Sequence, residues 1–285
     1  MKTKIYLMTL FATTLYMMCG CGDSRVLAMG PLATDSVCVS RVSEHVECRF
    51  VVDYPTADDS MSLATRKYLG EEFARLYLPI VNNPEEAGRY PVYKGNVNIG
   101  DSILNYYADG TTKYLKEQLA DFMDAVPSEV PTLAYDFSAR KTSDNDRYVN
   151  YNINVYAFLG GAHGTTTDYT VTIVKPSGRV LTQTVDTLQV KNLQPILRKG
   201  VLSYLHEQGE TDATEATLGD MLFVENGIIP LPVHTPYLTD DGVCFVYQQY
   251  EIASYAMGIV TFTVPYDQIK PYLTEEARSL GHCDR

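Results

Sequence analysis

The sequence predicts an α+β fold with a largely antiparallel sheet and a few packed helices. Several segments alternate apolar and polar residues with a period of two, which is the pattern of half-buried strands. Short turn sequences such as Pro176-Ser177-Gly178 and Asp241-Gly242 join some of these segments, and tight hairpins connect antiparallel neighbours. Segments with an apolar residue every three or four positions lie between them and predict helices. Strands and helices interleaved in this way are typical of the α+β class.

The first strand signal begins near Val37, is clearest over residues 46–52, and ends at Pro55. Asp58-Asp59-Ser60 offers N-cap residues for a helix that Asn82-Asn83-Pro84 stops. After a loop rich in Gly and Pro, a second helix is expected from about Asp109.

The remaining elements follow the same two periodicities. We expect Tyr148–Phe158, the strand after Gly164, and Gly258–Val264 to share one sheet. The other expected elements are strands over 133–139 and 243–247, a helix over 193–205, and a closing helix over 266–273.

Residues 1–20 have the three zones of a bacterial lipoprotein signal peptide. Lys2 and Lys4 precede the short apolar stretch Ile5 to Met18, and Gly20-Cys21 supplies a small residue before a cysteine. Cys21 is therefore the expected lipidation site, followed by a tether over residues 21–36, and lipid would hold the protein to a membrane. The alternative is an ordinary secretory signal that is cut elsewhere.

The charge of the chain limits its partners. The formal net charge is −12, and removal of Lys2 and Lys4 with the signal makes it −14. Such a surface repels nucleic acid, whereas it would attract a basic protein. We expect the protein in the cell envelope outside the cytoplasm, lipid-anchored, with the outer membrane as its expected site.

Four cysteines remain after processing: Cys38, Cys48, Cys244 and Cys283. Outside the cytoplasm Cys38 and Cys48 would be able to form a disulfide across a hairpin, and free buried thiols are the alternative. None of the four has metal-ligand spacing, so we expect no metal and no cofactor.

Two segments carry a family resemblance. The first is Phe158-Leu159-Gly160-Gly161-Ala162-His163-Gly164 at the end of a strand rich in Tyr and Asn. The second runs from Leu238 to Val243, continues with Tyr250-Glu251-Ile252-Ala253-Ser254-Tyr255-Ala256-Met257-Gly258, and ends at Val264-Pro265-Tyr266. Together they resemble the RsiV-like family, an extracytoplasmic domain of unknown function shared by the lysozyme-responsive anti-sigma factor RsiV and the peptidoglycan deacetylase PdaC.

This resemblance implies an N-terminal part of the domain over residues 37–164, a C-terminal part over 165–275, and a tail over 276–285. It also implies a mixed α/β domain without catalysis of its own, which in the anti-sigma factor binds lysozyme. Ser254 departs from the family pattern, which usually has proline there.

His163 is the first candidate for a functional residue, because histidine titrates near neutral pH and the neighbouring glycines leave room for a substrate. A base needs partners, and Asp168 and Glu251 are the available carboxylates. The alternative, which we prefer, is that Gly160, Gly161 and Gly164 shape a turn and His163 bonds nearby backbone.

Tyr250, Glu251 and Tyr255 form the second candidate site. Two tyrosines and a carboxylate on a loop suit a recognition surface, but Glu251 would equally be able to cap a turn while the rings fill the end of the sheet. The leading functional hypothesis is a lipid-anchored binding module whose ligand is lysozyme, another envelope protein or peptidoglycan. An envelope hydrolase centred on His163 and a structural or assembly lipoprotein are the alternatives.

Overall fold

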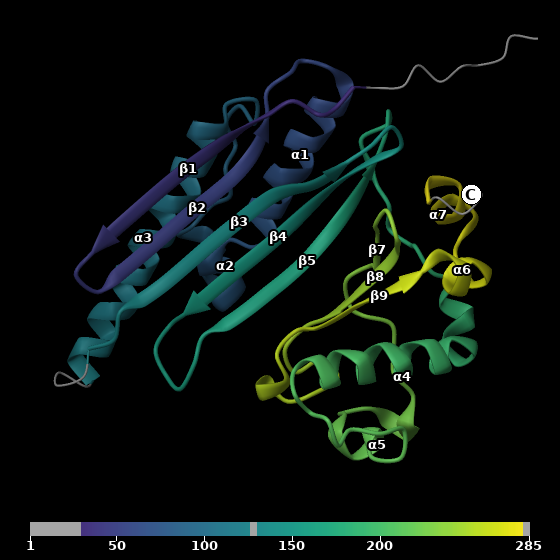
Figure 1. Cartoon of the computed structure of the whole chain (residues 1–285). Helices are drawn as coiled ribbons and strands as arrows, with labels where there is room; N and C mark the ends of the chain where they lie inside the picture. Colours follow the sequence, from purple (N-terminus) through teal and green to yellow (C-terminus); the bar gives the residue numbers. More distant parts are fainter. Residues whose placement is uncertain (1–29, 126–129, 282–285) are drawn as a thin grey trace, which may run out of the picture.

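The computed structural model describes residues 30–125 and 130–281 and confirms the α+β class (Figure 1). The described chain forms two sheets, each with its own hydrophobic core. A six-stranded sheet has the order β1-β2-β3-β4-β5-β6, and a three-stranded sheet has the order β7-β8-β9. We call the six-stranded sheet with the helices packed on it the first unit, and the three-stranded sheet with the C-terminal helices the second unit. The expected signal peptide, the expected lipidation site Cys21 and most of the expected tether lie outside the described residues.

The six-stranded sheet contains one parallel pair, β2 with β3, and its other pairs are antiparallel. The parallel pair arises because three helices separate these two strands in the sequence. Its strands are β1 (Thr34–Ser43), β2 (Val46–Pro55), β3 (Leu133–Asp144), β4 (Tyr148–Phe158), β5 (Thr165–Val174) and β6 (Arg179–Val180).

The helices of the first unit cover one face of this sheet (Figure 1). They are α1 (Ser60–Arg75), α2 (Leu78–Asn82), the short η1 (Pro84–Gly88) and α3 (Gly100–Ala125). Asp59 caps α1 as expected, since its carboxylate accepts the N–H of Ser62 at 2.8 Å. The expected first helix is broken after Arg75, and α3 begins at Gly100, earlier than predicted, because its first turns bury Ile103 and Leu104 in the core.

The second unit contains the three-stranded sheet and the C-terminal helices. The predicted membership of the last strand is wrong: β9 pairs with β8 and not with β4 or β5. The elements of the second unit are η2 (Thr187–Gln189), α4 (Val190–Glu207), α5 (Leu218–Met221), η3 (Glu225–Gly227), β7 (Tyr237–Leu238), β8 (Gly242–Tyr247), η4 (Tyr255–Met257), β9 (Val260–Pro265), α6 (Tyr266–Ile269), η5 (Lys270–Tyr272) and α7 (Glu275–Leu280).

Buried polar groups join the two units. The amide of Asn150 on β4 donates to the carbonyl of Leu238 on β7 at 2.7 Å, and the hydroxyl of Thr172 donates to Asn150 at 2.9 Å. Asn150 and Thr172 are each 2% exposed, so these bonds replace water completely. The asparagine face of β4 therefore points toward the second unit.

Three expected boundaries change. A division at residue 164 would separate β4 from its partner β5, so the first unit extends through β6. The expected tail begins inside α7, which Thr274 caps and which buries Ala277 and Leu280 in the second core. The last residues of the expected tether already belong to the fold, because Leu32 is buried and β1 begins at Thr34.

The chain enters the fold at a charged cluster at one end of the sheet. Asp144 accepts the N–H of Leu32 at 2.7 Å and forms ion pairs with Lys141 and the buried Lys175. Lys175 also donates to the carbonyl of Gly30 at 3.2 Å. Because β4 begins at this end, its eleven residues place the His163 loop about 33 Å away, at ~3.3 Å per residue.

The predicted disulfide between Cys38 and Cys48 is wrong, and all three described cysteines are free. Cys38 pairs with Val51 and Cys48 pairs with Arg41, so the two thiols lie at different positions along the hairpin. Cys38 is exposed, whereas Cys48 lies on the opposite, buried face with its thiol 3.8 Å from the carbonyl of Ala108.

Thiol labelling of the folded protein should therefore modify Cys38 and spare Cys48 and Cys244. Burial raises the pKa of Cys48 to about 12 and that of Cys244 above its ordinary value, which removes the reactive thiolate. Mass mapping of labelled peptides before and after unfolding measures this. A peptide containing Cys38 bridged to Cys48 would contradict the structure.

Candidate binding site

The His163 loop joins β4 to β5 and depends on two glycines with positive φ. Gly160 has φ 90° and Gly161 has φ 105°, values that residues with a side chain rarely adopt. Gly164 is required for space instead, because a Cβ built there would lie 2.4 Å from the ring of Tyr156. These residues turn the chain so that His163 is exposed at the end of the sheet.

The second predicted segment is the loop between β8 and β9. Its turn places Tyr250 at φ 65°, with 56% of the residue exposed. Glu251 points the other way, since its carboxylate accepts the backbone N–H of Gln248 at 2.7 Å and of Val233 at 2.6 Å. Burial raises the pKa of Glu251, while the two N–H donors act in the opposite direction. Glu251 therefore caps its turn, as the structural alternative proposed.

Two glutamines attach this loop to the open edge of β5. The side chain of Gln248 accepts the N–H of Asp168 at 2.9 Å and donates to the carbonyl of Asp168 at 2.6 Å. Gln249 accepts the N–H of Thr166 at 3.1 Å. An amide side chain presents a donor and an acceptor like a peptide group, so Gln248 pairs with β5 as a neighbouring strand would.

This attachment brings the rings of His163, Tyr250 and Tyr255 together, and we call these three residues the aromatic patch. The rings of His163 and Tyr255 stack with centroids 3.8 Å apart and an interplanar angle of 20°. The hydroxyl of Tyr255 donates to the carbonyl of Gly164 at 3.1 Å. Tyr250 lies beside both rings, and its hydroxyl is 3.4 Å from Nε2 of His163.

Both ring nitrogens of His163 have a polar neighbour. Nδ1 lies 2.9 Å from the carbonyl of Gly164, which can only accept, so Nδ1 carries a proton, and Nε2 lies 3.4 Å from the hydroxyl of Tyr250. Neither expected carboxylate contacts the ring. Asp168 accepts from Asn152 at 2.9 Å and Asn154 at 2.6 Å, and Glu251 caps its own turn. The patch thus presents ring faces and hydroxyls without an oriented acid–base pair.

A cavity of about 310 Å³ lies at the junction of the two units and was not predicted. On its wall the ring of His234 stacks on Tyr169, with centroids 4.0 Å apart and planes 7° apart. Glu72, 8% exposed, accepts the hydroxyl of Tyr169 and pairs with Arg75 at 2.6 Å. Because these partners come from α1, β5 and the segment before β7, no sequence spacing could reveal them.

Among residues 30–125 and 130–281, no three or more His, Cys, Asp or Glu side chains are grouped to hold a metal ion. Nor does any helix there combine the length and apolar character needed to cross a bilayer.

Removing the side chain of Gln248 should weaken the junction. Gln248→Ala leaves the N–H and carbonyl of Asp168 without their partner, so the free energy of unfolding should fall by about 1–3 kcal/mol. Gln208→Ala is the matched control, because Gln208 is exposed at the end of α4 and its effect should stay within about 0.5 kcal/mol. Equal unfolding midpoints in urea for the two variants would show that the contact contributes nothing.

His234 should make stability depend on pH. Its pKa lies below the ordinary 6.5 because burial disfavours the charged ring and Arg75 repels it, although Glu72 acts in the opposite direction. The unfolded chain then binds the proton more readily, so stability is lost as the pH falls below about 6.5. Urea unfolding at about pH 7.5 and 5.5 should show a larger loss for the wild type than for His234→Phe, which keeps a ring on Tyr169. The same loss in both proteins would assign the effect to other groups.

Part of the second unit matches a known protein family. Residues 187–267 match the sequence model of a family described as "Protein of unknown function (DUF3298)". The matched residues include α4, β7 to β9 and the loop with Tyr250, Glu251 and Tyr255. The matched family is the same domain family as the one that the two sequence segments resemble. No curated protein matches the sequence.

Two solved structures are similar to this chain. A member of the DUF3298 family from Bacteroides fragilis superimposes with a TM-score of 0.62 at 19% identity, over 85% of this chain and 93% of that one. A DUF3298 family protein from Pseudomonas aeruginosa gives 0.54 at 17% identity, over 87% and 97%. At such identities the likeness shows the fold alone. It extends over both units of this chain and not only over residues 187–267.

Proposed function

We propose that this protein is a lipid-anchored binding module of the bacterial cell envelope, and that the aromatic patch contacts its ligand. The observation that carries the proposal is the convergence of His163, Tyr250 and Tyr255, from two different units, on one exposed surface. Exposed tyrosines are favoured in binding surfaces because they bury much area at little entropic cost.

The position of the patch supports an anchored role. The described chain begins at Gly30, nine residues after Cys21, at the Asp144 end of the sheet. The patch lies at the opposite end of β4, about 33 Å away at ~3.3 Å per residue. A lipid at Cys21 would thus hold one end of the fold at the membrane and direct the patch away from it.

Charge favours a basic protein as the ligand. The mature chain carries a net charge of −14, which attracts cationic partners over a distance. The resemblance to the RsiV-like family suggests lysozyme as one such partner. Peptidoglycan is the second candidate, because the stacked pair of His163 and Tyr255 offers a ring face on which a sugar can pack.

The proposed role of the patch can be tested with purified lysozyme and with sacculi. Tyr250→Ala and His163→Ala should each weaken binding about tenfold, the effect of losing a central contact residue, and should leave the fold intact since both residues are exposed. Phe223→Ala is the control, because Phe223 is 62% exposed and outside the patch.

Equal binding by all three variants would refute a binding role for the patch. The hydrolase alternative makes a different prediction. It requires that His163→Ala stays folded and binds normally, yet abolishes turnover of an envelope substrate.

The anchor is tested by Cys21→Ala. This variant should accumulate as uncleaved precursor or leave the membrane, because acylation at Cys21 is the proposed attachment. Cell fractionation and intact mass measure both outcomes. A membrane-bound variant with the mature mass of the wild type would disprove lipidation at Cys21.

A further inference from the structure

Strand β9 has an open edge. It is the last strand of its sheet, with β8 on one side, and no other strand of residues 30–125 and 130–281 pairs with its far side. Edge strands present unpaired N–H and carbonyl groups, which can pair with another chain.

The register shows which residues present these groups. The carbonyl of Gly242 accepts the N–H of Thr239, so Gly242 and every second residue after it direct their backbone groups toward β7. The alternate residues face β9, and among them Phe245 is paired with Phe262. Phe262 therefore bonds inward, and Thr261 and Thr263 direct their N–H and carbonyl groups to the open edge.

Two other sheet edges, those of β5 and β7, are covered. Gln248 and Gln249 occupy the edge of β5, and the N–H and carbonyl of Leu238 on β7 bond to Thr172 and Asn150. At these edges, side chains of the same chain form hydrogen bonds with the backbone N–H and carbonyl groups. Within residues 30–125 and 130–281 the edge of β9 has no such cover, and the outer edge of β1 is likewise not paired with a strand.

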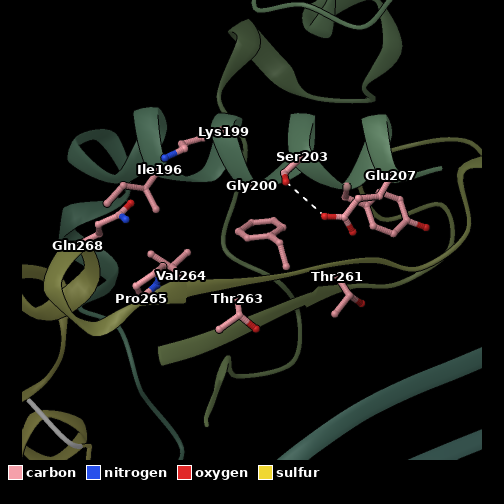
Figure 2. Close-up of a pocket in the computed structure, with 12 residues that line it drawn as sticks. Ile196, Lys199, Gly200, Ser203, Glu207, Thr261, Thr263, Val264, Pro265 and Gln268 are labelled. Atoms are coloured by element: carbon pink, nitrogen blue, oxygen red, sulfur yellow. Dashed lines mark hydrogen bonds between the residues drawn. The ribbon is translucent and has the colours of Figure 1, made fainter. Parts of the chain in front are cut away.

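A groove of about 420 Å³ runs along this edge beneath α4 (Figure 2). Gly200 permits the close approach of helix and strand, because a Cβ there would lie 2.2 Å from the ring of Phe262. Phe262 and Val264 are buried beside the groove, whereas Thr261 and Thr263 are exposed. Phe262 and Val264 thus line the groove beside the unpaired backbone groups, together with polar side chains such as that of Ser203.

The two ends of the groove carry opposite charges. In Figure 2, Lys199 lies at the end near Pro265 and Glu207 lies at the end near Thr261. Both side chains belong to exposed residues, and neither forms an ion pair with a residue in the described part of the chain. An occupant with a complementary charge at each end would be held in one direction.

We propose that the β9 edge and the groove under α4 bind an extended peptide segment of a partner protein as an added antiparallel strand. The segment carries an acidic residue beside Lys199 and a basic residue beside Glu207, with small apolar and hydroxyl side chains between them. Antiparallel pairing is the more stable arrangement, and it directs the acidic residue toward the N-terminus of the segment.

Packing argues against a second copy of this chain as the occupant. Two β9 edges paired about a twofold axis would lie about 4.8 Å apart. The two α4 helices, each lying along its own β9, would then overlap, because packed helices need about 8–10 Å between their axes. A single strand has no such helix and fits beneath α4.

The test uses two synthetic peptides with blocked ends, Asp-Thr-Val-Thr-Val-Thr-Lys and the charge-reversed Lys-Thr-Val-Thr-Val-Thr-Asp. The first should bind the wild-type protein about fivefold more tightly, the difference expected for two exposed ion pairs. Its binding should shift and protect the amide signals of Thr261 and Thr263 in NMR and hydrogen exchange. The double variant Lys199→Glu with Glu207→Lys should reverse the preference, and Tyr250→Ala should leave it unchanged, which separates this site from the aromatic patch.

Two results would overturn the proposal. One is the absence of any change at Thr261 and Thr263 with millimolar peptide. The other is equal affinity for both peptides in the wild type and the double variant.

Discussion

The hydrogen bonds between the two units are the constraint on which the rest of the structure depends. Each unit has its own apolar core, and apolar contact alone would allow the units to slide against each other. Buried polar groups are costly without partners, so the bonds of Asn150, Thr172 and Gln248 select one arrangement. That arrangement closes the edge of β5 and fixes the loop that carries Tyr250 and Tyr255.

The aromatic patch follows from this junction. Its histidine comes from the β4–β5 turn and its tyrosines from the β8–β9 loop, so it exists only while the units are held together. Positive φ at Gly161 and at Tyr250 shapes the two segments locally. The backbone that carries these side chains is thus held in place before a ligand arrives. Because less conformational freedom remains to be lost, binding costs less entropy.

Periodicity was sufficient to predict the α+β class and most individual strands and helices, because burial of one face determines which residues alternate. It could not place β9, since alternation shows that a strand exists and not which strand it pairs with. The cysteine hairpin shows the same limit. The short turn at Glu44-His45 sets the register and pairs Cys48 with Arg41, and composition alone does not determine a register.

The candidate site was predictable in part. Glycines around His163 and two tyrosines on a loop drew attention to the residues that the structure brings together, while the choice between binding and capping for Glu251 needed its backbone partners. The junction residues Gln248, Glu72 and His234 carry no motif. Their roles depend on contacts between segments far apart in the sequence.

Hydrogen exchange of the Thr166 and Asp168 amides tests most directly whether the junction holds the patch in place. Both N–H groups face away from β4 and are bonded only by the side chains of Gln249 and Gln248. If the units form one body, these amides exchange as slowly as those of the β4–β5 ladder, through global unfolding. Exchange at the rate of an exposed edge strand, while the ladder stays protected, would show that the two units separate in solution and would contradict the account.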